Sequence, residues 1–194
     1  MNNLPDLDRE LCENLLREYT KSESLLLHAF SVEACVAAYA TKFNKDPLYW
    51  GNVAMLHDFD YEMYPSPEEH PYKGAEILRA KGFSEDFIDS IMSHTPYTGV
   101  PRTTLLRKVL FACDELAGFI TAVSYVMPDK KVDQVEARSV LKKMKDKAFA
   151  RSVSREDIRG GAEILEIPLE EHIGFCIQAL RQLHTKLAPN PEKY

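Results

Sequence analysis

Apolar residues recur three or four positions apart along almost the whole chain, and no stretch of strand length alternates between apolar and polar residues. In residues 8–19, for example, Leu11, Leu15 and Leu16 form a narrow apolar stripe. Residues 103–127 are apolar on almost every side, which is typical of a buried central helix. The expected helices span residues 8–19, 22–42, 48–58, 71–81, 84–94, 103–127, 129–149, 154–167 and 167–184. The sequence therefore predicts an all-α protein.

Capping residues mark several of these helix boundaries. Ser84 is placed as an N-cap, because its hydroxyl can accept a hydrogen bond from the first turn. In the expected helix 71–81, His70 stands at the N-cap position and Pro71 is the first helical residue. Gly82 suits the left-handed conformation that closes a helix.

The size and charge of the chain restrict its partners. A length of 194 residues suits one domain with a small appendage, and a net charge of -6 argues against general binding to nucleic acids or anionic membranes. A small charged ligand is the expected partner, although a local basic patch is compatible with this charge. The first residues are acidic where a signal peptide is basic, and no run of about 18 apolar residues is present. We expect a cytoplasmic protein.

The chain divides by content into two parts. Residues 1–127 contain the histidine-rich helices, and residues 128–194 are expected to form C-terminal helices packed on them. Because no flexible linker separates the parts, a single domain 1–194 is the alternative. The four cysteines are far apart without a C-x-x-C pair, so we expect reduced core residues. These are Cys12, Cys35, Cys113 and Cys176.

Six polar residues fall on inward faces of five separate elements in this apolar interior. They are His28, His57, Asp58, His70, His94 and Asp114. Each one alone could be a hydrogen-bonded core residue. Together they are better explained by one or two divalent metal ions, because a buried carboxylate without a cation is costly and imidazoles are common metal ligands.

The order of these residues resembles the HD-domain metal-dependent phosphohydrolase superfamily, especially its two-metal HDIG-like branch. The similarity runs from about Tyr19 to Phe119, and "HPYKGAEIL" is similar to the HP..GA.IL segment that follows the His-Asp pair in that branch. The resemblance implies an HD-domain helical bundle with a small C-terminal helical extension.

The same resemblance implies roles for the six residues. His28, His57, Asp58 and Asp114 would hold one metal, and Asp58 would bridge to a second metal held by His70 and His94. His57 and Asp58 would form the catalytic pair. Two metals can hold a hydroxide for attack on a phosphoester. Imidazole and carboxylate ligands without thiolates suit Mn, Fe, Co, Ni or Zn.

The chain departs from the family pattern in three places. "HDFDYE" has Asp60 and Tyr61 where the HDIGK segment has glycine and lysine, which removes a positive charge. "SHTPYTGVP" has Thr95 after His94 where HD-GYP proteins have a paired histidine, so cyclic-dinucleotide hydrolysis is doubtful. Ser24 replaces a glutamate ligand found in some relatives.

Residues around the metal ligands are candidates for substrate binding. Lys73 and Arg102 are the basic residues best placed in sequence to bind phosphate oxygens, and solvated surface charge is the alternative for both. Tyr97 could stack on a base or cover the core. Asp60 and Glu62 could shuttle protons or simply be solvated.

Two histidines and five lysines in the second half of the chain are expected to have no catalytic role. His172 and His184 are expected to be partly exposed. A set of five lysines is expected to form a solvated helix face, with a partner surface as the alternative. The set is Lys130, Lys131, Lys142, Lys143 and Lys145.

The sequence thus predicts a metal-dependent phosphohydrolase that acts on a nucleotide or other small phosphorylated metabolite. Two alternatives are open: a diiron oxygenase built on the same ligands, and a non-catalytic regulatory module in which the metals are structural.

Overall fold

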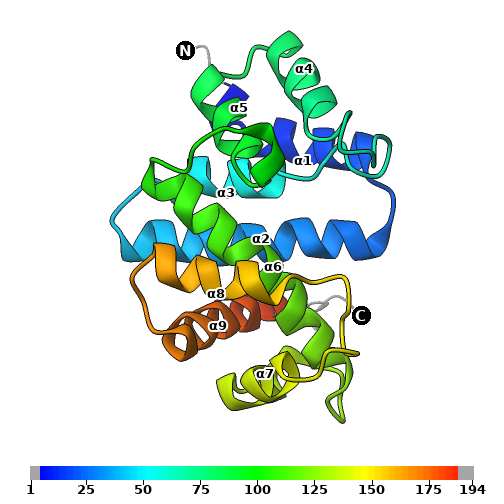
Figure 1. Cartoon of the computed structure of the whole chain (residues 1–194). Coiled ribbons are helices and arrows are strands. Elements are labelled where there is room, and N and C mark those ends of the chain that lie inside the picture. Colours follow the sequence, from blue (N-terminus) through cyan, green and yellow to red (C-terminus); the bar gives the residue numbers. More distant parts are fainter. Residues whose placement is uncertain (1–4, 188–194) are drawn as a thin grey trace.

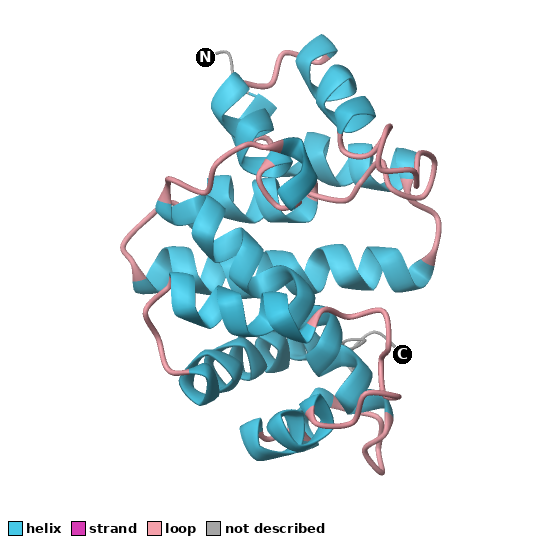
Figure 2. Cartoon of the chain, viewed as in Figure 1, coloured by secondary structure: helices cyan, strands magenta, loops and turns pink. Residues whose placement is uncertain are grey.

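The computed structural model describes residues 5–187, and its description of side chains extends to Leu183. Within this range the chain forms helices and turns and no β-strand, so the predicted all-α class is confirmed (Figure 2). The α-helices are α1 (Arg9–Tyr19), α2 (Glu23–Lys42), α3 (Pro47–Met55), α4 (Tyr72–Ala80), α5 (Glu85–Met92), α6 (Leu105–Tyr125), α7 (Ala137–Met144), α8 (Arg155–Ile164) and α9 (Leu169–Leu187). Three short 3-10 helices are η1 (Pro5–Leu7), η2 (Pro96–Thr98) and η3 (Val132–Gln134).

The two long helices α2 and α6 form the centre of the bundle. They pack on each other, and α2 also packs on α3 and α9 while α6 packs on α8. In Figure 1, α1, α3, α4 and α5 lie above α2, and α7, α8 and α9 lie below it. Residues from both halves meet in one hydrophobic core. The division into 1–127 and 128–194 stays a prediction.

Helix α2 is long and apolar enough to cross a membrane by length and composition. It nevertheless carries His28 and Glu33, and it packs on three other helices. These contacts are those of a central core helix.

Several helix starts agree with the sequence because the cap is a local interaction. The side chains of Asp8, Ser84, Thr104 and Ser154 each accept a hydrogen bond from a backbone N–H in the first turn of the next helix. Gly82 has a φ of +84°, the expected left-handed conformation. The four cysteines are free and buried, as predicted.

Three expected helices are wrong in extent. The segment 154–167 is helical only from Arg155 to Ile164. The segment 48–58 is helical only to Met55, so His57 and Asp58 lie in the turns that follow α3. The segment 129–149 contains only η3 and α7, because the backbone is extended at Lys131, Val135 and Glu136.

The cap assignment before α4 also changes. The helix begins at Tyr72, and Pro71 occupies the cap position without a side-chain hydrogen bond. His70 precedes it, joined to Pro71 by a cis peptide bond. His94 likewise follows the end of α5 and does not lie within it.

Candidate metal centre

The structure brings all six sequence-predicted ligands together. They come from α2, from the turns after α3, from the residues just before α4, from the turn after α5 and from the middle of α6. Each residue offers a ligand atom to one of two groups whose atoms lie within 4.8 Å of one another. The groups are His28, His57 and Asp114, and Asp58, His70 and His94.

The first group joins the two central helices to the turn after α3. Oδ1 of Asp114 lies 3.1 Å from Nε2 of His28 and 3.3 Å from Nε2 of His57. The two Nε2 atoms are themselves 3.3 Å apart. Gly118, one turn beyond Asp114, faces the His28 ring, and a Cβ there would lie 3.6 Å from its Nδ1, an ordinary van der Waals distance.

Asp58 faces both groups at once. Its Oδ1 lies 3.2 Å from Nε2 of His70 and 3.1 Å from Nε2 of His94. Its Oδ2 lies 3.4 Å from Nε2 of His57 and 3.9 Å from Nε2 of His28. A carboxylate in this position can link two cations.

The hydrogen bonds of the imidazoles determine which ring nitrogens face the centre of the cluster. Nδ1 of His57 lies 2.7 Å from the Ala54 carbonyl oxygen, and Nδ1 of His94 lies 2.6 Å from that of Ile91. A carbonyl can only accept, so both Nδ1 atoms carry the proton, and the Nε2 of a neutral ring presents a lone pair. Lone pairs and carboxylate oxygens therefore face one another, an arrangement that a metal cation satisfies.

The acid–base behaviour of these groups agrees with this geometry. Although burial opposes ionisation, the neighbouring histidines hold the pKa of Asp58 well below its usual range. Burial likewise disfavours a charged His70, but the carboxylates of Asp58 and Asp60 raise its pKa to about 9. In a chain without metal, protons supply the positive charge at this site. The residues are positioned to hold a metal ion.

Asp60 supports the ligand His70 from behind. Its carboxylate is completely buried and accepts hydrogen bonds from Nδ1 of His70 at 2.8 Å and from the backbone N–H of Gly74 at 2.7 Å. A Cβ at Gly74 would lie 2.9 Å from this carboxylate, so glycine is needed for the close approach. The alternative that Asp60 is solvated is therefore wrong. It orients His70, a candidate metal ligand.

Glu62 has a different partner. Its carboxylate accepts hydrogen bonds from the backbone N–H groups of Lys21 and Ser22 at 2.7 and 3.0 Å, at the start of α2. It is exposed, and it does not line the cavity over the ligands.

A cavity of about 330 Å³ opens over the six-residue cluster. It is lined by His28, Asp58, Tyr61, His70, His94, Thr95, Tyr97, Asp114, Glu115, Ser152 and Val153. The lining thus combines five of the six candidate ligands with two tyrosines and with Ser152 and Val153 from the segment before α8. This volume can accommodate a small ligand.

Of the three expected substrate-binding residues, one lines the cavity and two do not. Tyr97 lines the cavity, and its hydroxyl donates a hydrogen bond to the His70 carbonyl at 3.1 Å. Lys73 is partly exposed, lies outside the lining and forms an ion pair with Glu76 at 2.9 Å.

Arg102 binds backbone groups of the turn that contains His94. Its guanidinium donates hydrogen bonds to the carbonyls of Ser93 and His94, both at 2.9 Å, and lies 3.8 Å from the centre of the Phe111 ring. It fixes the turn that presents His94, and it is outside the cavity lining.

Glu115 is a lining residue that the sequence did not reveal. It accepts a hydrogen bond from the Ser154 N–H at 3.1 Å, and burial together with the Asp114 carboxylate raises its pKa to about 7. A second acid in the middle of a long, mostly buried helix was the available signal. Ser152 and Val153 were also missed, because they reach the cavity from 38 residues beyond Asp114.

His172 contradicts its expected exposure. It is fully buried, with Nε2 donating to the Ala112 carbonyl at 2.9 Å, so that Nδ1 accepts from the Tyr39 hydroxyl at 2.7 Å. The side chain of His184 lies outside the described residues.

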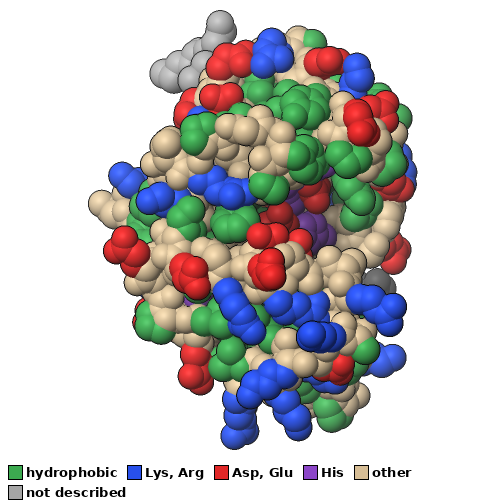
Figure 3. Space-filling model, viewed as in Figure 1, with side chains coloured by type: hydrophobic (Ala, Val, Ile, Leu, Met, Phe, Trp, Pro, Cys, Tyr) green, Lys and Arg blue, Asp and Glu red, His purple; other side chains and the backbone are tan. Residues whose placement is uncertain are grey.

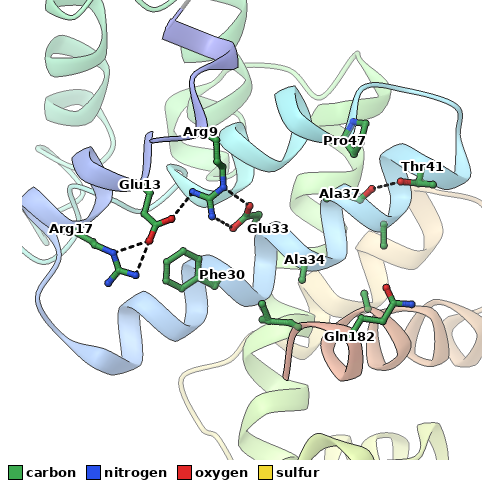
Figure 4. A pocket seen from close by; sticks show the side chains of 13 residues that line it. Arg9, Glu13, Arg17, Phe30, Glu33, Ala34, Ala37, Thr41, Pro47 and Gln182 are labelled. Carbon is green, nitrogen blue, oxygen red and sulfur yellow. Dashed lines mark hydrogen bonds and ion pairs between the residues drawn. The ribbon is translucent and has the colours of Figure 1, made fainter. Parts of the chain in front are cut away.

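A larger cavity of about 530 Å³ lies between α1, α2 and α9 (Figure 4). Its charged residues are paired, since Arg9 bridges Glu13 and Glu33, and Arg17 also binds Glu13. No group of possible metal ligands lies there among the described residues.

Comparison with known proteins finds a distant similarity to Ribonuclease Y of Malacoplasma penetrans (strain HF-2), with 25% identity over 119 residues. The alignment covers 59% of this chain and 24% of that protein, so the chain spans about a quarter of the length of its relative. No family model and no solved structure matches the chain.

Proposed function

We propose that this protein is an HD-type metal-dependent phosphohydrolase that cleaves a nucleotide or another small phosphoester. The observation that carries the proposal is the pair of ligand groups joined by Asp58 beneath an open cavity. Support for hydrolysis over oxygenase chemistry comes from the distant relative, whose name describes a nuclease.

Divalent cations bound at these groups would activate water and stabilise the charge of the reacting phosphate. The chain itself orients their ligands. His57 and His94 are fixed by backbone carbonyls, His70 is fixed by Asp60, and Asp58 faces both groups. In the reaction, a water oxygen bonds to phosphorus, the bond from phosphorus to the leaving oxygen breaks, and that oxygen takes up a proton.

The cavity walls suit one phosphate with an attached organic group. Among the lining residues there is no lysine or arginine, so the phosphate charge would be balanced by the metals. Tyr61 and Tyr97 are 41% and 47% exposed and offer ring faces to a base or sugar.

The test is the substitution Asp58→Ala, followed by metal analysis and assays over nucleotides, cyclic nucleotides and sugar phosphates. We expect loss of metal and of turnover, whereas Asp133→Ala, an exposed aspartate outside the cavity, should change neither. Retained metal with full turnover in Asp58→Ala would refute the proposal. Lack of turnover in the intact, metal-loaded chain on every phosphoester would favour the regulatory module.

A further inference from the structure

The basic residues of this acidic protein are concentrated in one segment beside the metal centre. Residues 137–155 contain seven lysines and arginines and one acidic residue, a net charge of +6. Because the whole chain carries -6, the remaining residues carry -12. Figure 3 shows Lys and Arg side chains gathered over α7 and the segment before α8, below a hollow in which histidine and acidic side chains are visible.

Four of these residues are exposed and make no ion pair with the residues that the structure describes. They are Lys142, Lys145, Lys147 and Arg151, here called the basic surface. A lysine in the last turn of α7 complements the helix dipole, which accounts for Lys142. The other three follow the helix end, so the dipole does not explain them.

The basic surface is continuous with the cavity along the chain. Arg151 directly precedes Ser152 and Val153, which line the cavity. Arg155 holds this turn in place, because its guanidinium donates to the carbonyls of Ala150 and Val153 at 2.6 and 2.7 Å. The turn that carries Arg151 beside the cavity is therefore held in place by hydrogen bonds.

Aromatic rings provide a second feature of the same cavity. Tyr61 and Tyr97 line it and are substantially exposed. Both contact His70: the ring centres of Tyr61 and His70 lie 5.3 Å apart, and the Tyr97 hydroxyl donates a hydrogen bond to the His70 carbonyl at 3.1 Å. Single-stranded nucleic acids bind to sites that combine a positive track for phosphates with aromatic rings on which bases stack.

We propose that the cavity and the basic surface together bind a short single-stranded oligonucleotide. One phosphodiester would enter the metal cavity, a base would stack on Tyr61 or Tyr97, and flanking phosphates would contact the basic surface. The net charge of the whole molecule does not prevent this, since charges farther than about 10 Å are largely screened at 0.1 M salt. The inference rests on the proposed function and names its substrate class. Hydrolysis would convert one phosphodiester and water into a phosphomonoester and a hydroxyl.

The test measures binding without requiring turnover. A fluorescent oligonucleotide of about ten nucleotides is titrated with metal-free protein at several salt concentrations, and binding is followed by anisotropy. Four phosphate contacts predict a slope of log K against log salt of about -3. The double variant Lys145→Glu/Arg151→Glu should lose at least about tenfold in affinity at low salt, with a slope of smaller magnitude.

The control variant Lys45→Glu/Lys81→Glu makes the same change in net charge at exposed lysines outside this segment. It should retain binding to within about twofold, and circular dichroism should show that both variants are folded. No binding by the unsubstituted chain at low salt, or equal losses in the two variants, would overturn the inference. Binding to anionic vesicles without binding to the oligonucleotide would also overturn it. Because metal-free protein is used, these outcomes are independent of whether the cavity hydrolyses phosphoesters.

Discussion

The substitution Asp60→Asn tests whether the buried carboxylate controls the ligand His70. The two oxygens of Asp60 accept from Nδ1 of His70 and from the N–H of Gly74. Asparagine has nearly the same shape but only one acceptor oxygen. In either orientation of the amide, its NH₂ group faces one of these two donors.

The expected cost follows from that mismatch. A buried donor without an acceptor destabilises the fold by about 1–3 kcal/mol. If the His70 ring relieves the mismatch by moving its proton to Nε2, that nitrogen can no longer bind a metal. Loss of such a supporting group typically lowers metal affinity by about 10–100-fold, which is about 1.4–2.7 kcal/mol.

The assay is a competition titration of Mn²⁺ or Zn²⁺ against a chelator, with denaturant unfolding of the metal-free protein alongside. We expect the affinity for one of two bound metals to fall in Asp60→Asn. Glu62→Gln is the matched control, because it makes the same chemical change two residues away at an exposed carboxylate. Two metals bound with unchanged affinity in Asp60→Asn would show that His70 is oriented without this carboxylate.

Three further predictions concern packing, pH and substrate binding. Gly161→Ala should cost about 1–3 kcal/mol in a urea titration, because its Cβ would lie 2.6 Å from Cα of Ala112, whereas Gly174→Ala, with open space around it, should not destabilise. The raised pKa of His70, about 9 in the metal-free chain, stabilises the fold below pH 6.5, and this contribution of about 3 kcal/mol is lost as pH rises toward 9. Thermal melts in chelator should therefore show a decline of Tm over this range, and a Tm that stays constant from pH 6.5 to pH 9 would contradict it. Lys73→Ala should change kcat/KM by less than about twofold, since this side chain is paired outside the cavity; a larger loss would return it to the substrate site.

The fold could be predicted where the determining interaction is local. N-caps bind backbone groups two or three residues away, so their signal is contained in a short stretch of sequence. Apolar periodicity is a weaker guide, because it shows which residues are buried and not which backbone buries them. Val132 and Val135 are buried three residues apart, as in a helix, yet α7 begins only at Ala137.

The turn after α3 shows the same ambiguity. The spacing that placed His57 inward was correct, since its exposure is 0%. The backbone nevertheless leaves the helix at Met55, and the Phe59 carbonyl accepts a hydrogen bond from the Thr20 hydroxyl at 3.0 Å, 39 residues away in sequence. Such a partner is chosen by tertiary packing, which the local pattern does not contain.

The six candidate ligands could be predicted from the sequence because buried charges need a common explanation. The residues that surround them could not be predicted. Asp60 belongs to an acidic loop and gives no sign in sequence that it turns inward to His70. Ser152 and Val153 are ordinary residues of a turn, and only the packing of α8 on α6 brings that turn to the cavity.

Buried histidines in this chain separate into two kinds, and the separation depends on the second ring nitrogen. In His172 both nitrogens are satisfied by the chain, through the Ala112 carbonyl and the Tyr39 hydroxyl, so no cation is required. Burial accordingly lowers the pKa of His172. In His57 and His94 one nitrogen donates to a carbonyl, and the other faces a carboxylate and another imidazole. All three are buried and near apolar neighbours, so sequence position could not distinguish them. Only the partner of the second nitrogen indicates whether a histidine belongs to the core or to a metal.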